Sequence, residues 1–204
     1  MARPTLTDEQ RRATRQKIRK AASELHAELG IANISARGVA ERAGVSVGTL
    51  YTHFGNLTTL MQSLWRQPAR KLVEELNAIA AAEPAAAPRL RQLLEAYVAF
   101  SSANEGVFRG AFLFVRPASA EPAERHVTLE GDGFFSVFNQ CMVQGQAEGI
   151  FRAGDSETLT QLVLSAVHGA LALPVNWQRL QLRDATTTAK LAIDAQMEWL
   201  QITD

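Results

Sequence analysis

Apolar residues recur at the three- and four-residue spacing of helices along nearly the whole chain. The alternation of apolar and polar residues around a turn pair that marks a β-hairpin does not occur. The first expected helix opens with a capping box of Thr7 and Gln10 and ends at Gly30. Its apolar stripe consists of Ala13, Ile18, Ala21, Ala22, Leu25 and Leu29. Its outward side carries Arg11, Arg12, Arg15, Arg19 and Lys20. The pattern predicts an all-α fold of about nine helices.

Three helices with recognisable caps follow the first one. Ser35, Ser46 and Asn56 are the expected N-caps, and the helices run over about 35–43, 46–54 and 56–82. Gly44 and Gly55 end the first two of these helices. Residues 83–88 (EPAAAP) then interrupt the helical pattern, so we expect a loop or hinge there.

Five more helices are expected beyond this break. They span about 90–103, 105–115, 126–148, 155–173 and 184–202, with a loop around 117–122. Asp155 or Ser156 caps the fourth of them, and Pro174 ends it. We therefore expect two domains, residues 1–55 and residues 56–204, with the helix that starts at residue 56 as their connector.

Composition narrows the class of protein. No run of about 18 apolar residues and no apolar segment near the charged N-terminus is present, so neither a membrane span nor a signal peptide is predicted. The single cysteine, Cys141, fits a reducing cytoplasm. HExxH, GxSxG and P-loop patterns are missing, and the histidines are scattered. A cytoplasmic protein that is not an enzyme and holds no metal or cofactor is predicted.

The net charge of zero conceals an asymmetry. Residues 1–66 contain ten Lys or Arg and five Asp or Glu, whereas the remainder contains eleven basic and sixteen acidic residues. A basic first third on an acidic body indicates that one end meets a polyanion. Solvated helix faces produce the same pattern, so charge alone leaves both interpretations open.

Residues 35–54 (SARGVAERAGVSVGTLYTHF) have the spacing of a helix-turn-helix. The small Ala40 lets two helices cross closely, Gly44 ends the first helix in a left-handed conformation, and Ser46 caps the second. Leu50 and Phe54 bury one face of the second helix, and its other face fits the major groove of B-DNA. The structural alternative is a look-alike that arises from the packing of three helices.

Together with Val39 and Ala40, the run AGVSVGTLYTHFGN resembles the signature of the TetR (tetracycline-repressor) family of bacterial regulators. The resemblance covers about residues 8–66 and implies that double-stranded operator DNA is the partner. The residues with an implied or possible DNA contact are Arg37, Ser46, Val47, Gly48, Thr49, Tyr51, Thr52, His53 and Asn56.

Within this set, the resemblance implies that Tyr51 and His53 contact phosphates or base edges and that Gly48 allows a close approach to the DNA backbone. Two positions depart from the family pattern. Val47 stands where many relatives carry Lys or another polar residue, and Leu57 stands in place of a common phosphate-binding Lys. Each lost cation makes the salt dependence of DNA binding shallower. Val47 can instead meet a thymine methyl, and the helix start at Asn56 can offer backbone amides to a phosphate.

The second half, including 96–114 and 162–173, resembles a TetR subclass with a His-Gly pair in the penultimate helix. In that family the last two helices of each subunit form a four-helix dimer interface, and Gly169 permits close approach of another helix. The apolar residues expected at such an interface are Leu159, Leu162, Val163, Ala166, Val167, Ala170, Ile193, Met197 and Leu200. The alternative is that these residues form internal core.

Aromatic residues concentrate between Phe100 and Phe138, so a pocket for an apolar or aromatic effector is expected there. Its expected lining is Phe100, Phe108, Phe112, Phe134, Phe138, Met142, His168 and Trp177. Ordinary core packing explains the same residues.

These features predict a ligand-responsive regulator, a repressor that binds a palindromic operator as a homodimer and is released by a small molecule. Effector binding would shift the population of dimers toward a state whose recognition helices no longer match successive major grooves. A DNA-binding regulator without an effector is the alternative.

Overall fold

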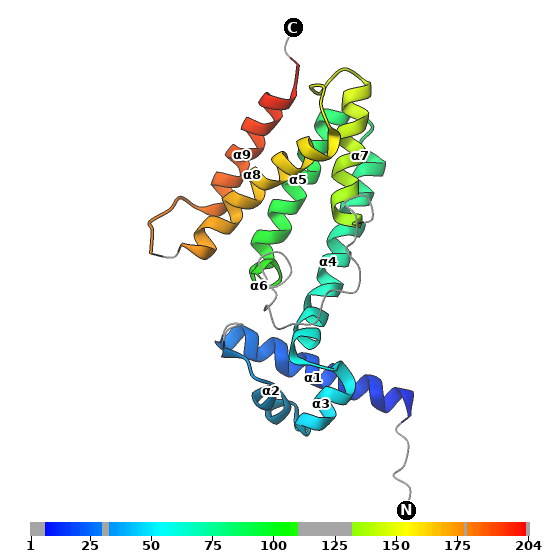
Figure 1. Ribbon diagram of the computed structural model, residues 1–204, viewed down its shortest axis with the longest axis vertical. Coiled ribbons are helices and arrows are strands. Elements are labelled where there is room, and N and C mark those ends of the chain that lie inside the picture. The colour runs from blue at the N-terminus through cyan, green and yellow to red at the C-terminus, as the bar shows by residue number, and fades with distance from the viewer. Residues whose placement is uncertain (1–6, 30–32, 110–131, 178, 203–204) are drawn as a thin grey trace, which may run out of the picture. The chain divides into compact units, whose positions relative to one another are not determined.

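The computed structural model describes residues 7–29, 33–109, 132–177 and 179–202 (Figure 1). Within these ranges the chain is helical, as predicted, with one isolated β-bridge between Phe151 and Gln201. The helices are α1 (Asp8–Leu29), α2 (Ala36–Ala43), α3 (Val47–Phe54), α4 (Leu57–Ala82), α5 (Ala86–Ala103), α6 (Glu105–Val107), α7 (Gly133–Ala147), α8 (Ser156–Asn176) and α9 (Ala185–Leu200).

The chain divides into two compact units. Unit 1 comprises Met1–Ala69 and Gly106–Phe114, and unit 2 comprises Arg70–Glu105 and Val115–Asp204. This division falls inside α4, whereas the sequence-based division at residues 55 and 56 treats all of α4 as a connector. The first half of α4 groups with unit 1 because Trp65 and other apolar side chains of that half lie in its core.

The core of unit 1 joins α1, α2, α3 and the start of α4. Ile18 and Ala22 from α1 pack with Val39, Leu50 and Leu60, and all five side chains are fully buried. The predicted stripe of α1 is confirmed at its centre. Its two end members, Ala13 and Leu29, are exposed, because the helix extends beyond the helices that cover its middle.

The start of α1 has the predicted capping box. The Thr7 amide donates to Gln10 Oε1 at 2.9 Å, and the Gln10 amide donates to Thr7 Oγ1 at 3.2 Å. This reciprocal pair satisfies amides that the first helical turn leaves without a backbone partner. The predicted end at Gly30 lies outside the described residues.

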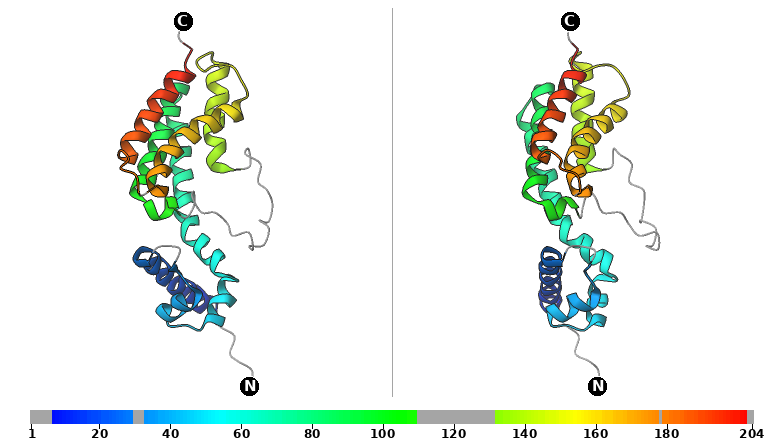
Figure 2. Two further views of the ribbon diagram at one scale, coloured as in Figure 1. Left: turned by 60° about the vertical axis from the view of Figure 1, so that its left-hand side comes forward. Right: turned by 90° about the vertical axis from the view of Figure 1, so that its left-hand side faces the viewer.

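Unit 2 is a helical bundle in which α8 and α9 run side by side and α5 packs against α7, α8 and α9 (Figures 1 and 2). The centre of this bundle holds fully buried side chains from four helices: Leu93, Leu94, Tyr97, Phe138, Met142, Val167 and Ile193. Such a core supplies most of the free energy that holds short helices together.

Several predicted boundaries beyond residue 82 are wrong. The loop after α4 covers only residues 83–85, because Pro88 lies in the first turn of α5, where proline's missing amide costs no helical hydrogen bond. Pro174 does not end α8, which continues to Asn176, and the Trp177 amide still donates to Leu173 O at 2.9 Å. In α9 the helix ends at Leu200 rather than at Ile202.

Two predicted helices extend outside the described residues. Of the helix expected over 105–115, the structure describes α6 and two further residues. Of the helix expected over 126–148, it describes Gly133–Ala147 with Asp132 as N-cap, and the loop expected around 117–122 falls in the same gap.

The C-terminal end of unit 2 is held by contacts around Phe151 that the sequence pattern does not predict. Phe151 is 1% exposed, and its ring lies against Gly145 of α7 so closely that a Cβ there would come within 2.1 Å of Phe151 Cδ2. The Arg152 amide donates to Leu200 O at 2.9 Å, and the Ile202 amide donates to Ile150 O at 3.2 Å. The turn after α7 therefore ties the end of α9 to the bundle.

Among the described helices, α8 is the one that is long and apolar enough, by length and composition, to cross a membrane. The sequence analysis anticipated no such segment. The buried core helix of a soluble protein meets the same criterion, and α8 contributes Val163 and Val167 to the core of unit 2.

Candidate nucleic-acid interface

The helix-turn-helix predicted over residues 35–54 is present with the predicted caps. Ser35 Oγ accepts the Gly38 amide at 3.1 Å, and Ser46 Oγ accepts the Thr49 amide at 3.0 Å. Gly44 has a φ of 66°, in the left-handed region, and its amide bonds back to α2. The Val45 amide donates to Ala40 O at 2.9 Å, which closes the turn.

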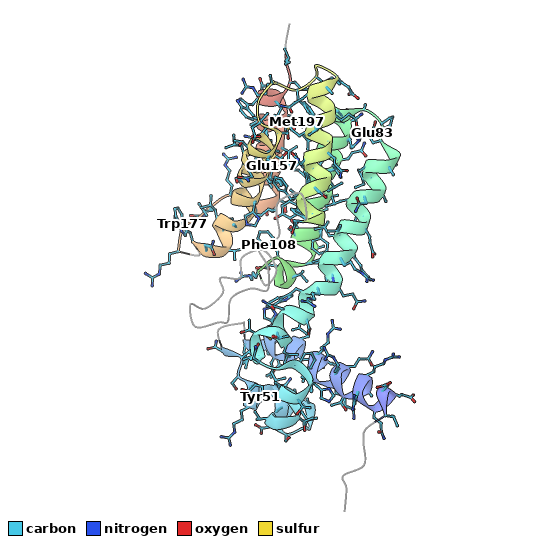
Figure 3. The ribbon with its side chains drawn as sticks, turned by 45° about the vertical axis from the view of Figure 1, so that its right-hand side comes forward. Tyr51, Glu83, Phe108, Glu157, Trp177 and Met197 are labelled. Carbon is cyan, nitrogen blue, oxygen red and sulfur yellow. The ribbon has the colours of Figure 1, made fainter. Side chains whose placement is uncertain are left out.

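Helix α3 has one buried and one exposed face. Leu50 is 0% exposed and Phe54 is 4% exposed, and both pack into the core of unit 1. Gly48, Tyr51 and Thr52 are exposed, and the Tyr51 side chain, labelled in Figure 3, has 45% of its surface in solvent. The buried side fixes the rotation of α3, so these three residues form the outer face.

Three other residues of the predicted DNA-binding set lie at the margin of this face. Thr49 and His53 are half-buried. Val47 is also half-buried, and it packs against the core of unit 1. Val47 therefore lies near the outer face, and the first turn of α3 turns its side chain toward the core.

The hydroxyl groups of α3 are ordered by hydrogen bonds within the motif. Ser46 Oγ and Thr49 Oγ1 lie 2.8 Å apart, and Thr52 Oγ1 donates to Gly48 O at 2.8 Å. Each bond fixes a rotamer, while the oxygen keeps lone pairs that can accept from a base edge. The hydroxyl groups of Ser46, Thr49 and Thr52 are thus held in place within the motif.

Gly48 is not required by the fold. A Cβ built on it would meet one neighbour, Ser46 Oγ, at the ordinary contact distance of 3.7 Å. Glycine inside a helix destabilises it relative to alanine. A binding partner that approaches α3 closely therefore explains this glycine better than packing within the protein does.

Arg15 of α1 holds the end of α3. Its Nη1 donates to His53 O at 2.6 Å, and its guanidinium carbon lies 4.4 Å from the centre of the Phe54 ring. One turn later, Arg19 Nη2 donates to Ser63 O of α4 at 2.9 Å. The sequence analysis placed both arginines on the outward basic side of α1. The structure shows them bound to backbone carbonyls, a role that helix periodicity cannot reveal because it depends on the crossing of α1 with α3 and α4.

The His53 ring is held in its neutral form. Burial lowers the pKa of His53 below its ordinary value, and the charges of Arg15 and Arg11 lower the pKa further. A neutral imidazole at pH 7 can donate one hydrogen bond to a phosphate but brings no positive charge.

The start of α4 has the predicted cap, since Asn56 Oδ1 accepts the Thr59 amide at 2.7 Å. Leu57 is half-buried and packs against the core of unit 1, so it occupies an interior position in place of a cation. Arg37 in the first turn of α2 is exposed. By contrast, Arg42 is engaged by Glu28 of α1, with both nitrogen–oxygen distances at 2.8 Å.

The residues predicted to line an effector pocket are divided between the units. Phe108 is buried in unit 1, Phe112 lies outside the described residues, and Trp177 is 55% exposed at the end of α8 (Figure 3). Trp177 lines a shallow depression with Asn176, Arg179 and Leu180. Of the predicted set, Phe108 therefore belongs to unit 1, and Trp177 belongs to unit 2.

The remaining predicted residues, together with Tyr97, belong to unit 2. Phe134 lies 5.2 Å from both Phe138 and Tyr97 between ring centres, and the Tyr97 hydroxyl lies 2.7 Å from His168 Nδ1. Tyr97 was missed by the sequence analysis. Its only signal is its place in the helical stripe of α5, which looks like ordinary core. Met142 is fully buried, and Phe100 is half-buried.

Most residues predicted at a dimer interface are buried within one protomer. These are Leu159, Val163, Val167, Ala170, Ile193, Met197 and Leu200. They cannot face a partner because α8 and α9 turn their most apolar sides toward each other and toward α5 (Figure 3 labels Met197). Leu162 is 50% exposed and Ala166 is half-buried, so these two remain accessible.

The outer surfaces of α8 and α9 nevertheless carry large apolar side chains. Exposed members of this set are Leu162, Leu173, Leu191 and Trp199. Gly169 of α8 fits the same picture, since a Cβ built there would meet no atom within 4 Å. Among the described residues, no group of three His, Cys, Asp or Glu side chains is arranged to hold a metal ion.

Residues 18–64 match the family model described as bacterial regulatory proteins, tetR family. A comparison with curated proteins finds no match. Among solved structures, the chain is similar to a tetR family transcription regulator from Shewanella sp. PV-4, with a TM-score of 0.67 and 18% identity over 93% of this chain and 99% of that one.

It is also similar to the TetR family regulator PfmR of Thermus thermophilus, with a TM-score of 0.65 and 22% identity over 89% of this chain and 97% of that one. FadR of Bacillus subtilis, solved in complex with stearoyl-CoA, gives a TM-score of 0.70 and 18% identity over 90% of this chain and 98% of that one. Residues 18–64 therefore match the tetR family model, and the chain has the fold of solved regulators described as tetR family members.

Proposed function

We propose that this chain is a transcriptional repressor that binds a palindromic operator as a homodimer and releases it when a small, largely apolar or aromatic effector binds. The observation that carries the proposal is the outer face of α3, where Gly48, Tyr51 and Thr52 are exposed together on a helix whose opposite face is buried. A helix presented in this way enters the major groove of B-DNA.

Each residue of the outer face has a distinct task in this proposal. The Tyr51 phenol contacts a phosphate or a base edge, Thr52 and Thr49 contact base edges, and Gly48 lets the DNA backbone come close. Neutral His53 and the cap residue Ser46 each offer one hydrogen bond. Because Leu57 and Val47 supply no charge, few cations neutralise phosphates, and the salt dependence of binding is shallow for its class.

One basic side chain and a helix N-terminus beside the motif complete the contact surface. Arg37 is exposed in the first turn of α2 and reaches a base or a phosphate. The first amides of α4, next to Asn56, point out of a helix N-terminus, where the helix dipole favours an anion. Contacts of this kind position the protein on DNA, and the α3 contacts specify the sequence.

Dimerisation uses the outer surfaces of α8 and α9. Leu162, Leu191 and Trp199 would lose their exposed apolar area against a second copy, and Gly169 lets a helix of that copy approach closely. A twofold dimer also presents two α3 helices to half-sites about 34–36 Å apart. Val167 and Ile193 are part of the protomer core and do not belong to this surface.

Effector binding is assigned to unit 2 and its cluster of aromatic rings. A solved structure with the same fold, FadR of Bacillus subtilis, was determined in complex with stearoyl-CoA, which supports a small-molecule ligand for a chain of this fold. Helix α4 belongs to both units. A conformational change around its part in unit 2 would therefore change the separation of the two α3 helices in the dimer. The effector must bind the released state several kcal/mol better than the DNA-bound state.

We assign this regulator to the cytoplasm.

The proposal is tested by measuring operator affinity for Tyr51→Ala by fluorescence anisotropy, with the duplex that the protein enriches from a random library. The matched control is Leu29→Ala, which truncates a similarly exposed side chain of unit 1 that lies on α1. We expect the first variant to lose at least about tenfold in affinity and the control to bind like the parent. Equal affinity for all three proteins would contradict the proposal.

A further inference from the structure

Ser101, near the end of α5, carries a buried hydroxyl group without a partner. The residue is 3% exposed, and its Oγ is the one buried side-chain oxygen or nitrogen of the described residues that makes no hydrogen bond. Buried polar groups in folded proteins almost always have a partner, so an exception calls for an explanation.

The hydroxyl lies in polar and aromatic surroundings. Tyr97 is one helical turn before Ser101, on the same face of α5. Burial raises the pKa of Tyr97 and the nearby Ser101 hydroxyl acts in the opposite direction, although the two hydroxyl groups do not reach hydrogen-bond geometry. The Tyr97 hydroxyl is instead 2.7 Å from His168 Nδ1, in two nearly parallel rings.

Aromatic rings border this group of polar atoms. The ring of Phe134 meets the Tyr97 ring edge to face at 5.2 Å, and Phe138 lies 5.2 Å beyond it. Phe138 is fully buried, whereas Phe134 and His168 are half-buried. The cluster thus extends from the core of unit 2 toward its surface, and its rings offer flat apolar contacts.

The polar side chains of the cluster are uncharged at pH 7. Burial is the largest cause of both the lowered pKa of His168 and the raised pKa of Tyr97, and the Ser101 hydroxyl does not ionise. An anion brought next to these groups would lose its hydration without gaining a counter-charge from them. A neutral hydroxyl or carbonyl needs only a hydrogen bond to make up for its lost water.

We propose that Ser101, beside the Tyr97–His168 pair, binds an uncharged hydrogen-bonding group of an aromatic ligand. The ligand's hydroxyl or carbonyl supplies the missing partner of Ser101 Oγ, and its ring stacks among Phe134, Phe138 and Tyr97. This inference rests on the proposed effector binding by unit 2. It adds the class of ligand, a neutral aromatic alcohol or carbonyl compound.

Three probes of nearly the same shape test the class of ligand on the full-length protein. Binding of benzene, phenol and benzoate is measured by NMR, from shifts of the His168 ring signals, which are identified by their absence in His168→Gln. We expect phenol to bind about three- to tenfold more tightly than benzene, the range that one hydrogen bond provides. Benzoate is expected to bind more weakly than benzene.

Two serine variants localise the hydrogen bond. Ser101→Ala should bring the phenol affinity down to that of benzene and leave benzene binding unchanged. The matched control is Ser102→Ala, which removes the neighbouring hydroxyl, exposed and bonded to Thr186 Oγ1 at 3.0 Å. That variant should keep the phenol preference. Without any probe, Ser101→Ala should raise the melting temperature by roughly 2–4 °C, because it removes a buried hydroxyl without a partner.

The proposal is overturned if phenol binds no better than benzene, if no probe shifts the His168 signals, or if Ser101→Ala keeps the phenol preference. A fall in melting temperature for Ser101→Ala would show that a water or a protein group already satisfies the hydroxyl, and would also overturn it. Operator affinity is measured separately. Phenol binding without any effect on operator affinity would leave the ligand site intact and contradict only the effector role in the proposed function.

Discussion

Arg15 Nη1 of α1 donates a 2.6 Å hydrogen bond to the backbone oxygen of His53, and the same guanidinium covers the Phe54 ring at 4.4 Å. His53 O is one of the last carbonyls of α3, which have no partner within their own helix. A cation at this end also complements the helix dipole. Arg15 thereby sets the position of the outer face of α3. Its charge and its place in the basic first third of the chain would instead suggest a contact with DNA phosphates.

Arg15→Gln tests whether this arginine positions α3 or contacts DNA phosphates. We expect a several-fold loss of operator affinity with an unchanged slope of log affinity against log salt. A phosphate contact would instead reduce that slope by about 0.9. The two cases are separated by anisotropy titrations at several salt concentrations.

Arg12→Gln serves as the matched control because Arg12 is an exposed arginine on the same helix. Thermal unfolding should show a loss of about 1 kcal/mol for Arg15→Gln, the value of an ordinary hydrogen bond, and almost none for the control. Similar losses in the two variants would show that Arg15 has no special role.

Gly48→Ala should separate folding from function. Alanine fits at this position, where the nearest atom to its Cβ is Ser46 Oγ at 3.7 Å, so we expect a gain of about 0.5–1 kcal/mol in the free energy of unfolding. Operator affinity should fall at least about tenfold, since the methyl group meets the DNA backbone. Gly44→Ala is the contrasting variant, because its φ of 66° makes alanine destabilising there. A Gly48→Ala protein that binds operator normally would refute the close approach.

Stability should decline in mild acid because three histidines resist protonation in the folded chain. Burial is the largest cause of the lowered pKa of His26, His53 and His168. The unfolded chain binds these protons at the ordinary pKa of about 6.5, so the stabilisation is complete above that pH and is lost as pH falls through the folded-state values.

This prediction is checked by melting temperatures between about pH 8 and pH 5, a range in which most carboxylates stay ionised. His168→Gln removes the described histidine of unit 2, whose pKa is lowered by burial, and the melting temperature of this variant should fall less steeply with acid than that of the parent. Parallel curves would exclude a contribution from His168.

Gly145→Ala should be among the most damaging small substitutions in unit 2. Its Cβ would lie 2.1 Å from Cδ2 of the fully buried Phe151, so the ring must move, at a cost of about 1–3 kcal/mol. Combining it with Phe151→Leu should recover part of this loss in a double-mutant cycle followed by denaturant unfolding. Additive losses would mean that the two positions do not interact.

The contrast between residues 35–54 and unit 2 shows what sequence can predict. Caps such as Ser46 and Asn56, the turn at Gly44 and the burial of Leu50 depend on neighbours within a few residues, and all of them are confirmed. Local spacing decides these features, so one sequence is enough to find them.

Features that depend on how helices cross are not visible in the same way. Arg15 looks like any exposed arginine, and the apolar stripe of α8 does not reveal that Val167 faces its own chain while Leu162 faces outward. Helix α8 is apolar over more than one face, and only packing decides which face is internal. The roles of Gly145 and Ser101 likewise depend on tertiary structure, because Gly145 lies against the Phe151 ring and Ser101 Oγ has no hydrogen-bond partner.

The central claim is that two copies of α3 read a symmetric DNA site, and selection from a random duplex library tests it most directly. We predict an enriched sequence with two inverted half-sites whose centres lie about 10 base pairs apart or a multiple of this spacing, bound by an even number of protomers in native mass spectrometry. No enrichment, or an asymmetric site bound by one protomer, would contradict the account.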